Sequence, residues 1–294
     1  MSSTDTYRYA AARLATQGII CQKVMYDGGV YERKLSCYPH LVVCGAGHVA
    51  LALSKVAVGI GFKVTVIDPR AEFANQERFG KDVHVICDDF GPALAQFKNE
   101  YIWYAVMTRG HKDDELCAEA ALKGKYMYCG MIGSKSKVAY AKDLLAKAGC
   151  TQEQLDSLHA PIGLSIGAQT PEEIAISICA QLVQERAALG CSYLDNQVYE
   201  ALLHEQGGMT VATIIEKKGS APRGVGSCLA VVDEKSTIYG TVGGGSVEAA
   251  VIEQAKAMHE GDAPFIKTYD LSNSAAATLG MVCGGAVTVL FERT

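Results

Sequence analysis

A short glycine turn between apolar segments constrains the fold of this chain more than any other feature. Residues 41–44 form an apolar run typical of a buried strand, and the sequence Gly-Ala-Gly-His-Val-Ala follows directly at residues 45–50. Residues 48–58 then have the apolar spacing of a helix, and residues 63–68 form a second apolar run that ends in an aspartate. The sequence therefore predicts a strand, a tight turn, a helix and a second strand in continuous succession.

The turn has the residue types of a dinucleotide-binding site. Gly45, Gly47 and Ala50 match the spacing in which glycines allow phosphates to approach the main chain and a helix start attracts an anion. Asp68 follows about 20 residues later, where a carboxylate can accept a hydrogen bond from a ribose hydroxyl. We therefore predict that Gly45, Gly47 and Asp68 bind a phosphate-bearing nucleotide. The structural alternative is that the glycines only allow tight packing of the helix on the strand.

Further side chains near this turn are candidate ligand contacts. Arg70 lies two residues after Asp68 and could bind a 2′-phosphate or another anionic group. His48 opens the predicted helix, where a ligand contact and a plain helix start are both open interpretations. His111 lies in a loop at the same predicted sheet edge and is either an acid–base candidate or a solvated loop residue. The sequence alone does not decide among these roles.

The alternation of strands and helices continues along the chain. Further apolar runs alternate with helical segments at residues 83–86, 103–107 and 126–129. This pattern predicts a parallel sheet with helices on both faces. Thr170, Pro171 and Glu173 then provide an N-cap, a first-turn proline and a capping-box glutamate, which open a helix that Gly190 ends. We therefore expect a domain boundary near Gly190.

Beyond this boundary the chain changes to strands separated by glycine clusters. The expected strands lie around residues 211–215, 228–232 and 286–290. We therefore expect an α/β protein with a Rossmann-like doubly wound parallel sheet and a smaller α/β C-terminal domain. The expected parts are an N-terminal helix and hairpin segment, the Rossmann-like domain and the second domain, at residues 1–38, 39–190 and 191–294.

Consecutive glycines mark a second candidate site. Gly243, Gly244 and Gly245 stand between an expected strand and an expected helix. Such a run is entropically costly unless the main chain must come close to a ligand or to another chain segment. Both interpretations are open.

Three side chains near the glycine-rich turns of this domain are candidates for chemistry. Cys283 lies in a turn between glycines and is either an accessible thiol or a buried structural cysteine. As a thiolate near a cation such as Arg223, it could bind a soft metal or carry sulfur. Glu248 begins a helix, where the helix dipole favours a carboxylate, and it is also a candidate base.

Composition argues against several classes of partner. The formal net charge is −5 without a basic run, which argues against nucleic acid, and no apolar run is long enough to span a bilayer. The first residues have neither the basic region nor the apolar stretch of a secretory signal, so we expect a cytoplasmic protein. The 11 cysteines include no Cys-x-x-Cys pair, so we expect mostly reduced core cysteines and no metal site.

Several ordered motifs together resemble the XdhC/CoxI family of xanthine dehydrogenase accessory proteins. In the second domain these are Gly-Ser-Ala-Pro-Arg, Gly-Gly-Gly-x-Val-Glu and Gly-Met-x-Cys-Gly-Gly, at residues 219–223, 243–248 and 280–285. In the first domain they are the glycine turn, Asp-Pro-Arg, and the segment that opens Pro-Ile-Gly-Leu, at residues 45–49, 68–70 and 161–175. In the usual family order the Gly-Ser-Ala-Pro-Arg domain precedes the Rossmann domain, whereas in this chain it follows it.

The resemblance implies a maturation factor more than a turnover enzyme. Such a factor binds the molybdenum cofactor (molybdopterin), allows a cysteine desulfurase to replace a molybdenum oxygen by sulfur, and delivers the cofactor to a molybdenum hydroxylase apoenzyme. A homodimer is among the expected assemblies. Carried over by position, the candidate cofactor surface consists of Arg223, Gly243, Gly244, Gly245, Glu248 and Cys283. The nucleotide-like pocket consists of Gly45, Gly47, His48, Asp68 and Arg70.

Two other functions are compatible with the same residues. The first is an NAD(P)-dependent oxidoreductase that uses the glycine turn and Asp68 for its cofactor and His111 as acid–base group. The second is a regulator that senses a nucleotide without chemistry. The glycine-rich second domain is hard to explain by nucleotide sensing alone.

Overall fold

The computed structural model describes residues 6–97, 101–233, 237–270 and 285–294. The chain divides into two compact units. One consists of Tyr38–Gly190, and the other of Met1–Cys37 together with Cys191–Thr294. We call them the Rossmann unit and the second unit, for the reasons given below.

The Rossmann unit is built on a six-stranded parallel sheet. Its strand order is β5-β4-β3-β6-β7-β8, in which the first strand of the unit, β3, lies in the middle and the chain winds outward in both directions. The strands are β3 (His40–Cys44), β4 (Lys63–Ile67), β5 (Val83–Ile86), β6 (Ile102–Val106), β7 (Tyr126–Met131) and β8 (Leu158–His159). Every residue of β6 is buried, as the centre of a sheet covered on both faces requires. The predicted doubly wound sheet is confirmed.

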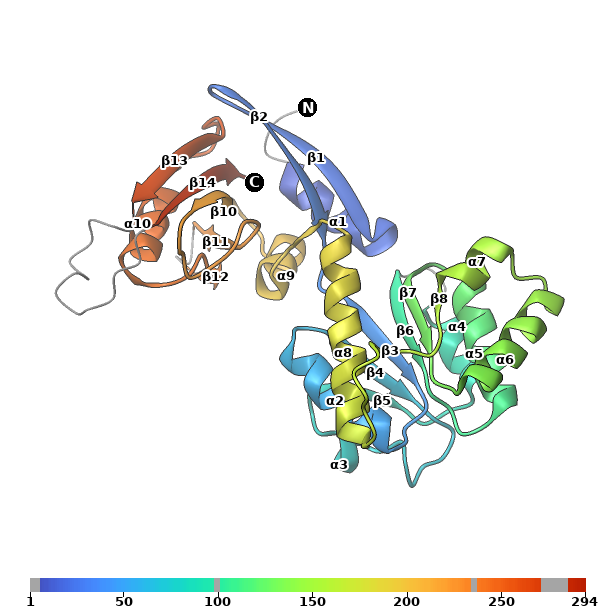
Figure 1. The fold of residues 1–294 in the computed structure, drawn as a ribbon. Helices are drawn as coiled ribbons and strands as arrows, with labels where there is room; N and C mark the ends of the chain where they lie inside the picture. The colour runs from blue at the N-terminus through green and yellow to red at the C-terminus, as the bar shows by residue number, and fades with distance from the viewer. Residues whose placement is uncertain (1–5, 98–100, 234–236, 271–284) are drawn as a thin grey trace. The chain divides into compact units, whose positions relative to one another are not determined.

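Helices cover both faces of this sheet (Figure 1). One face packs against α2 (His48–Gly59), α3 (Gln76–Phe79) and α8 (Pro171–Ala188). The other packs against α4 (Phe90–Ala95), α5 (His111–Lys123), α6 (Lys135–Lys147) and α7 (Gln152–Ser157). Two buried apolar clusters result, one on each face. Across the parts of the chain that the structure describes, no helix has both the length and the apolar character needed to cross a membrane.

Helix starts in this unit follow the local sequence signals. The Thr170 hydroxyl accepts a hydrogen bond from the Glu173 N–H, and the Glu173 carboxylate accepts one from the Thr170 N–H, so the predicted capping box is confirmed. Pro171 occupies the first helical position, as predicted. Ser134 caps α6 in the same way, by accepting from the Lys137 N–H.

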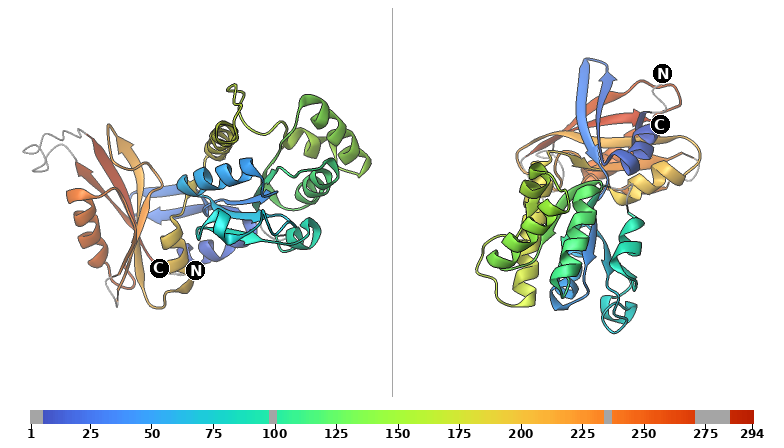
Figure 2. Two further views of the ribbon diagram at one scale, coloured as in Figure 1. Left: turned by 90° about the horizontal axis from the view of Figure 1, so that it is seen from below. Right: turned by 90° about the vertical axis from the view of Figure 1, so that its right-hand side faces the viewer.

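The second unit contains a five-stranded antiparallel sheet and a smaller three-stranded one. The five-stranded order is β12-β11-β10-β14-β13, made by Ile238–Gly240, Cys228–Val232, Met209–Lys218, Ala286–Arg293 and Phe265–Asp270. The smaller sheet joins the hairpin of β1 (Ile19–Tyr26) and β2 (Gly29–Ser36) to β9 (Ser192–Tyr193). Helix α10 (Gly245–Lys256) packs on one face of the larger sheet, and α1 (Thr6–Gln17) and α9 (Asn196–His204) pack on the other (Figure 2).

The N-terminal helix and hairpin belong to the second unit. Arg33 on β2 forms a two-pronged ion pair with Glu292 on β14, and both side chains are buried. The Tyr7 hydroxyl of α1 lies 3.1 Å from the Thr213 hydroxyl of β10. The sequence assigned residues 1–38 to a separate segment, whereas the structure groups residues 1–37 with residues 191–294 because these contacts join the two ends of the chain.

Candidate functional site

Gly45 places the turn between β3 and α2 against the neighbouring strands. Its φ is +110°, in the region that favours glycine. A Cβ atom at Gly45 would lie 2.8 Å from the carbonyl carbon of Met107 and closer still to its oxygen. The Gly45 N–H donates to the Ile67 carbonyl at 2.7 Å. Only a glycine at this position lets the main chain pass between the ends of β4 and β6.

The start of α2 lies directly after this turn. Gly47 is the N-cap residue, so no side chain at that position caps the helix, and a Cβ there would meet nothing within 4 Å. The His48 side chain is exposed at the first helical position. The main chain at the helix start is therefore open to a ligand, which is the geometry that an anion-binding turn requires.

Asp68 is committed to contacts within the protein. Its carboxylate is buried, and its Oδ2 accepts hydrogen bonds from the Ala46 N–H and from Arg70 Nη2, each at 2.8 Å. Its Oδ1 accepts from the Arg70 N–H at 3.0 Å and from Arg70 Nε at 2.8 Å. These bonds occupy the four acceptor positions of a carboxylate. The contact with a ribose hydroxyl stays a prediction, and it would have to replace one of them.

The electrostatics of this pair keep both groups charged. Burial raises the pKa of Asp68, but the hydrogen bonds from the Arg70 side chain and from the N–H groups of Ala46 and Arg70 outweigh burial, and the net pKa lies below the ordinary value. The hydrogen bonds to Asp68 raise the pKa of Arg70 in turn. The guanidinium is therefore a permanent cation beside the turn, with its side chain 24% exposed.

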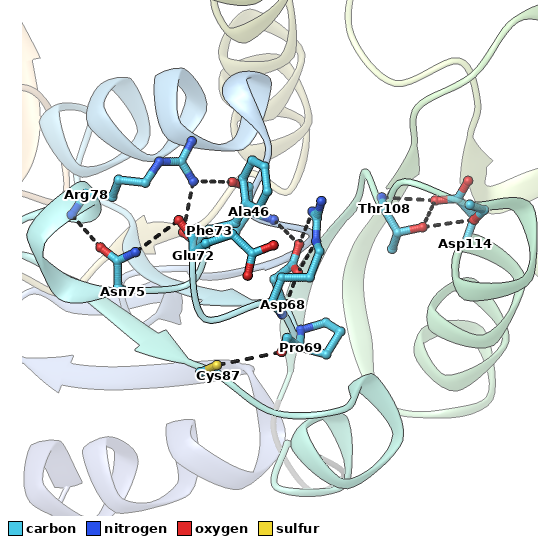
Figure 3. A network of polar contacts seen from close by, with 12 residues as sticks. Ala46, Asp68, Pro69, Glu72, Phe73, Asn75, Arg78, Cys87, Thr108 and Asp114 are labelled. Carbon is cyan, nitrogen blue, oxygen red and sulfur yellow. Dashed lines mark hydrogen bonds and ion pairs between the residues drawn. The ribbon is translucent and has the colours of Figure 1, made fainter.

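Two arginines surround one aromatic ring near the turn. Cζ of Arg70 lies 4.1 Å from the centroid of the Phe73 ring, and Cζ of Arg78 lies 5.1 Å from it. Arg78 Nη1 donates to the carbonyls of Ala46 and Phe73 at 2.7 and 2.9 Å (Figure 3). Ala46 is thus held by Asp68 through its N–H and by Arg78 through its carbonyl. Sequence reasoning missed Arg78, because nothing in the spacing of residues 76–79 relates them to the turn.

The next loop along the sheet edge is held by a second carboxylate. Asp114 Oδ1 accepts from the Thr108 N–H at 3.0 Å and from the Thr108 hydroxyl at 2.7 Å, and Oδ2 forms an ion pair with Lys137. Asp114 is buried, so this loop is rigidly tied to α5 and α6. His111 opens α5, but its side chain lies outside the described part of the structure, so its acid–base role stays a prediction.

The second candidate site begins with the run of glycines before α10. Gly243, Gly244 and Gly245 have φ values of +129°, +88° and +72°. A Cβ atom at Gly244 or Gly245 would meet nothing within 4 Å, so these positions need glycine for its backbone conformation rather than for space. The chain uses this conformation to reverse direction between β12 and α10.

The carboxylate of Glu248 caps this turn from within. Its Oε2 accepts from the N–H groups of Val242, Gly243 and Gly244 at 3.0, 3.2 and 3.1 Å, and the Thr241 hydroxyl donates to the same oxygen. Burial raises the pKa of Glu248, but these hydrogen bonds outweigh burial and leave the pKa below its ordinary value. An ionised carboxylate with a lowered pKa is a weak proton acceptor. The contacts therefore favour a structural role for Glu248 over that of a base.

The structure brings Arg223 to the same turn. A Cβ atom at Gly243 would lie 3.0 Å from Cβ of Pro222 and 3.4 Å from Cγ of Arg223, so the Gly-Ser-Ala-Pro-Arg segment packs against the glycines. The Arg223 side chain is exposed. Gly285 approaches the same segment, because a Cβ there would lie 3.1 Å from the carbonyl carbon of Ser220. Cys283 lies outside the described residues.

The other cysteines are mostly core residues, as predicted. Six of the free cysteines that the structure describes are buried, namely Cys44, Cys117, Cys129, Cys150, Cys179 and Cys228. Burial raises the pKa of the Cys179 and Cys228 thiols to about 12. Such thiols are unreactive at neutral pH. No cluster of three or more His, Cys, Asp or Glu side chains suited to a metal ion occurs in the described ranges.

Comparison with known proteins identifies both units. The family model for the XdhC Rossmann domain matches residues 41–182, and the model for the XdhC and CoxI family matches residues 202–270. The chain belongs to the XdhC/CoxI family. Its two family segments occur with the Rossmann segment first, as the sequence motifs indicated.

Two curated relatives are similar to about half of this chain, and both are longer than the segment that matches. The Escherichia coli (strain K12) protein named "Uncharacterized protein YqeB" is 32% identical over 147 residues, which cover 50% of this chain and 27% of that protein. A Bacillus subtilis (strain 168) protein, named as a probable xanthine dehydrogenase subunit, is 27% identical over 158 residues, which cover 53% of this chain and 46% of that protein. The match therefore spans less than half of each curated relative.

A solved structure is similar over about half of this chain. The crystal structure of a xanthine dehydrogenase from Bacillus halodurans is 29% identical, with a TM-score of 0.46, and the match covers 54% of this chain and 46% of that one.

Proposed function

We propose that this chain is an accessory factor for the maturation of a xanthine dehydrogenase-type molybdenum hydroxylase. Family membership of both units carries the proposal, because the two family models match separate segments in the same chain. The name of the Bacillus subtilis relative, a probable xanthine dehydrogenase subunit, supports the same client class. The partners of such a factor are the hydroxylase apoenzyme and a cysteine desulfurase. A homodimer stays a prediction.

We further propose that the glycine turn of the second unit holds the molybdenum cofactor. When bound, this cofactor supplies the molybdenum atom on which an oxygen is exchanged for sulfur before insertion. The donors in the structure suit its phosphate: the start of α10 presents main-chain N–H groups, and Arg223 is exposed beside Gly243. Glu248 holds the turn in shape rather than accepting a proton.

The proposed role of Cys283 rests on the sequence and on the family resemblance. A thiolate suits either a soft metal or a transferred sulfur. Arg223 would favour the thiolate if the two side chains meet in the loaded protein. Cys283 is therefore the residue whose replacement separates cofactor delivery from every other function considered for this chain.

The test is cofactor retention in a host that makes the molybdenum cofactor. We expect the purified protein to release a fluorescent pterin on oxidation, and to activate a cofactor-free molybdenum hydroxylase. Cys283→Ser should lose hydroxylase activation, whereas Cys21→Ser, which removes an exposed thiol on β1, should keep it. Protein that neither carries pterin nor takes up added cofactor would contradict the proposal. Equal activation by Cys283→Ser and the unchanged protein would contradict the thiol role alone.

An NAD(P)-dependent oxidoreductase is the second candidate, because the turn at Gly45 and the open start of α2 have the geometry of a nucleotide site. Nucleotide binding by itself does not distinguish the two functions. An oxidoreductase requires a change in nicotinamide absorbance that depends on a second substrate. We expect no such change with purines or aldehydes, the substrate types of molybdenum hydroxylases.

A further inference from the structure

We propose that the Rossmann unit binds an adenine dinucleotide whose ribose carries a 2′-phosphate, and that Arg70 is the residue that recognises this phosphate. The proposal concerns a ligand of the glycine turn at Gly45. It is independent of molybdenum cofactor binding by the second unit. The argument rests on which polar groups of this turn are already occupied and which are not.

The usual recognition of an unphosphorylated ribose is blocked at Asp68. In doubly wound folds, an acidic residue at the end of the second strand accepts hydrogen bonds from the ribose hydroxyls. In this chain both oxygens of Asp68 are filled by the Ala46 N–H and by Arg70. A free ribose would have to break one of these bonds within a buried carboxylate, which is costly because the displaced donor loses its partner.

Arg70 has N–H donors that are still available to a ligand, whereas the acceptor positions of Asp68 are filled. A guanidinium carries five N–H groups. Asp68 takes one from Nε and one from Nη2. Among the described residues, the hydrogen bonds of the Arg70 side chain go to Asp68 alone, which leaves both N–H groups of Nη1 and the second of Nη2 to bind two oxygens of one phosphate.

The orientation of the Arg70 guanidinium is fixed before a ligand binds. Asp68 holds one edge of the guanidinium, and the Phe73 ring lies 4.1 Å from its Cζ. The Arg70 side chain is nevertheless 24% exposed, so its remaining N–H groups are accessible. A fixed guanidinium loses little side-chain entropy on binding, which favours a bidentate contact with phosphate over a contact with a hydroxyl.

The place of Arg70 in the fold matches the 2′-position of an adenosine ribose. When the pyrophosphate lies at the start of α2, the ribose reaches the end of the second strand of the sheet, which is β4 here. Arg70 follows β4 by three residues. The Asp68–Arg70 pair has no net charge, so recognition depends on the directed N–H groups of Arg70 and on the positive end of α2.

The test is a comparison of matched nucleotides by titration calorimetry on the full chain. We expect NADPH to bind at least about tenfold more tightly than NADH, and 2′,5′-ADP more tightly than 5′-AMP, since a charge-assisted bidentate contact accounts for such a ratio. The preference should fall as salt is raised, because Arg70 is partly exposed. These arms need no variant, so they decide the proposal even if substitutions disturb folding.

Variants then assign the preference to Arg70. Arg70→Gln should lower NADPH affinity about tenfold without lowering NADH affinity, because it frees acceptor positions of Asp68 for a ribose hydroxyl. Arg70→Lys should give an intermediate loss of NADPH affinity. Lys81→Gln, which removes an exposed cation from the same unit, should leave the ratio unchanged. Equal binding of NADPH and NADH, a ratio that survives Arg70→Gln, or no binding of either nucleotide would each overturn the inference. The pterin assay is unaffected by these outcomes, so the two proposals fail separately.

Discussion

The two glycine turns of this chain differ in how a carboxylate contacts their main-chain N–H groups. Both lead into the start of a helix of 12 residues, α2 or α10, and both bring a carboxylate to main-chain N–H groups. At the first turn the carboxylate is Asp68, which takes a single N–H of the turn and is neutralised by Arg70. At the second turn it is Glu248, whose Oε2 takes three main-chain N–H groups itself.

This difference predicts how each turn receives an anion. The first turn keeps the main chain at the start of α2 free of a capping side chain, and Arg70 neutralises the carboxylate of Asp68 beside it, so the turn presents no net negative charge to a phosphate. At the second turn an internal carboxylate already occupies the N–H groups of residues 242–244. A phosphate there has to bind further into α10 and use Arg223. The second turn should therefore be more rigid without a ligand and less selective for phosphate.

The largest effect should come from Gly45→Ala. The added Cβ would collide with the Met107 carbonyl, and alanine would be strained at φ +110°. We expect a loss of roughly 2–5 kcal/mol in the free energy of unfolding. The single tryptophan, Trp103, is buried in the Rossmann unit, so urea unfolding followed by its fluorescence reports this unit.

Gly47→Ala is the matched control for that substitution. A Cβ at Gly47 meets nothing within 4 Å, and its backbone is extended with φ −68°. We expect a change below about 1 kcal/mol. If Gly45→Ala were as mild as Gly47→Ala, the close approach of the turn to Met107 would be wrong.

The contrast between these two glycines also shows how far sequence reasoning reaches. The strands and helices of the Rossmann unit were predictable because each strand is a continuous apolar run, such as Ile102–Val106, and because the capping residues of α8 lie within four positions of one another. The motif likewise located the turn. The motif could not show that a side chain would collide with the protein at Gly45 but not at Gly47. The collision at Gly45 depends on the Met107 carbonyl, which is 62 positions away in the sequence.

Contacts between distant segments explain the remaining differences. The Arg33–Glu292 ion pair joins residues 259 positions apart, and no local pattern relates them, so the N-terminal segment could not be assigned to the second unit from sequence. The same limit applies to the site. The sequence identified Asp68 and Glu248 as candidate functional carboxylates. In the structure both accept hydrogen bonds from main-chain N–H groups, and these partners depend on how the turns fold.

The next largest effect should come from removing the internal carboxylate of the second turn. Glu248→Ala leaves the N–H groups of residues 242–244 without their acceptor, and we expect a loss of about 1–3 kcal/mol. Glu248→Gln keeps an acceptor oxygen and should lose about 1 kcal/mol. Hydrogen exchange of β10 and β14 measures this unit, because Trp103 does not report it. Glu253→Ala on the exposed side of α10 is the control and should stay within about 0.5 kcal/mol.

A smaller effect is expected from Gly244→Ala. Its φ of +88° strains an alanine by about 1–2 kcal/mol, but the Cβ meets no atom within 4 Å. The substitution should therefore cost less than Gly45→Ala, where strain and collision add. Gly224→Ala, at an exposed position in the same unit with nothing within 4 Å of the Cβ, should be neutral or slightly stabilising by hydrogen exchange. A larger loss for Gly244→Ala than for Gly45→Ala would reverse the comparison of the two turns.

The smallest expected effect is the loss of stability in acid that the two carboxylates cause. Asp68 and Glu248 both have pKa values below their ordinary values of 3.8 and 4.5, so the unfolded chain binds more protons than the folded chain in acid. The stability that each contributes is complete above its ordinary pKa and is lost as the pH falls through the lower pKa of the folded state. Urea unfolding between about pH 5 and pH 3 should show this loss in both units.

Salt should then separate the two carboxylates. The pKa of Asp68 is lowered largely by the partly exposed Arg70, whereas that of Glu248 is lowered by a hydroxyl and by N–H groups that carry no net charge. Raising the salt concentration should therefore reduce the acid-dependent loss in the Rossmann unit more than in the second unit, because salt screens an ion pair more than it screens neutral donors. Glu248→Gln should flatten the acid dependence of the second unit alone. Equal salt sensitivity in both units would mean that Arg70 does not neutralise Asp68 in solution. The two turns would then differ only in the close contacts and backbone conformations of their glycines.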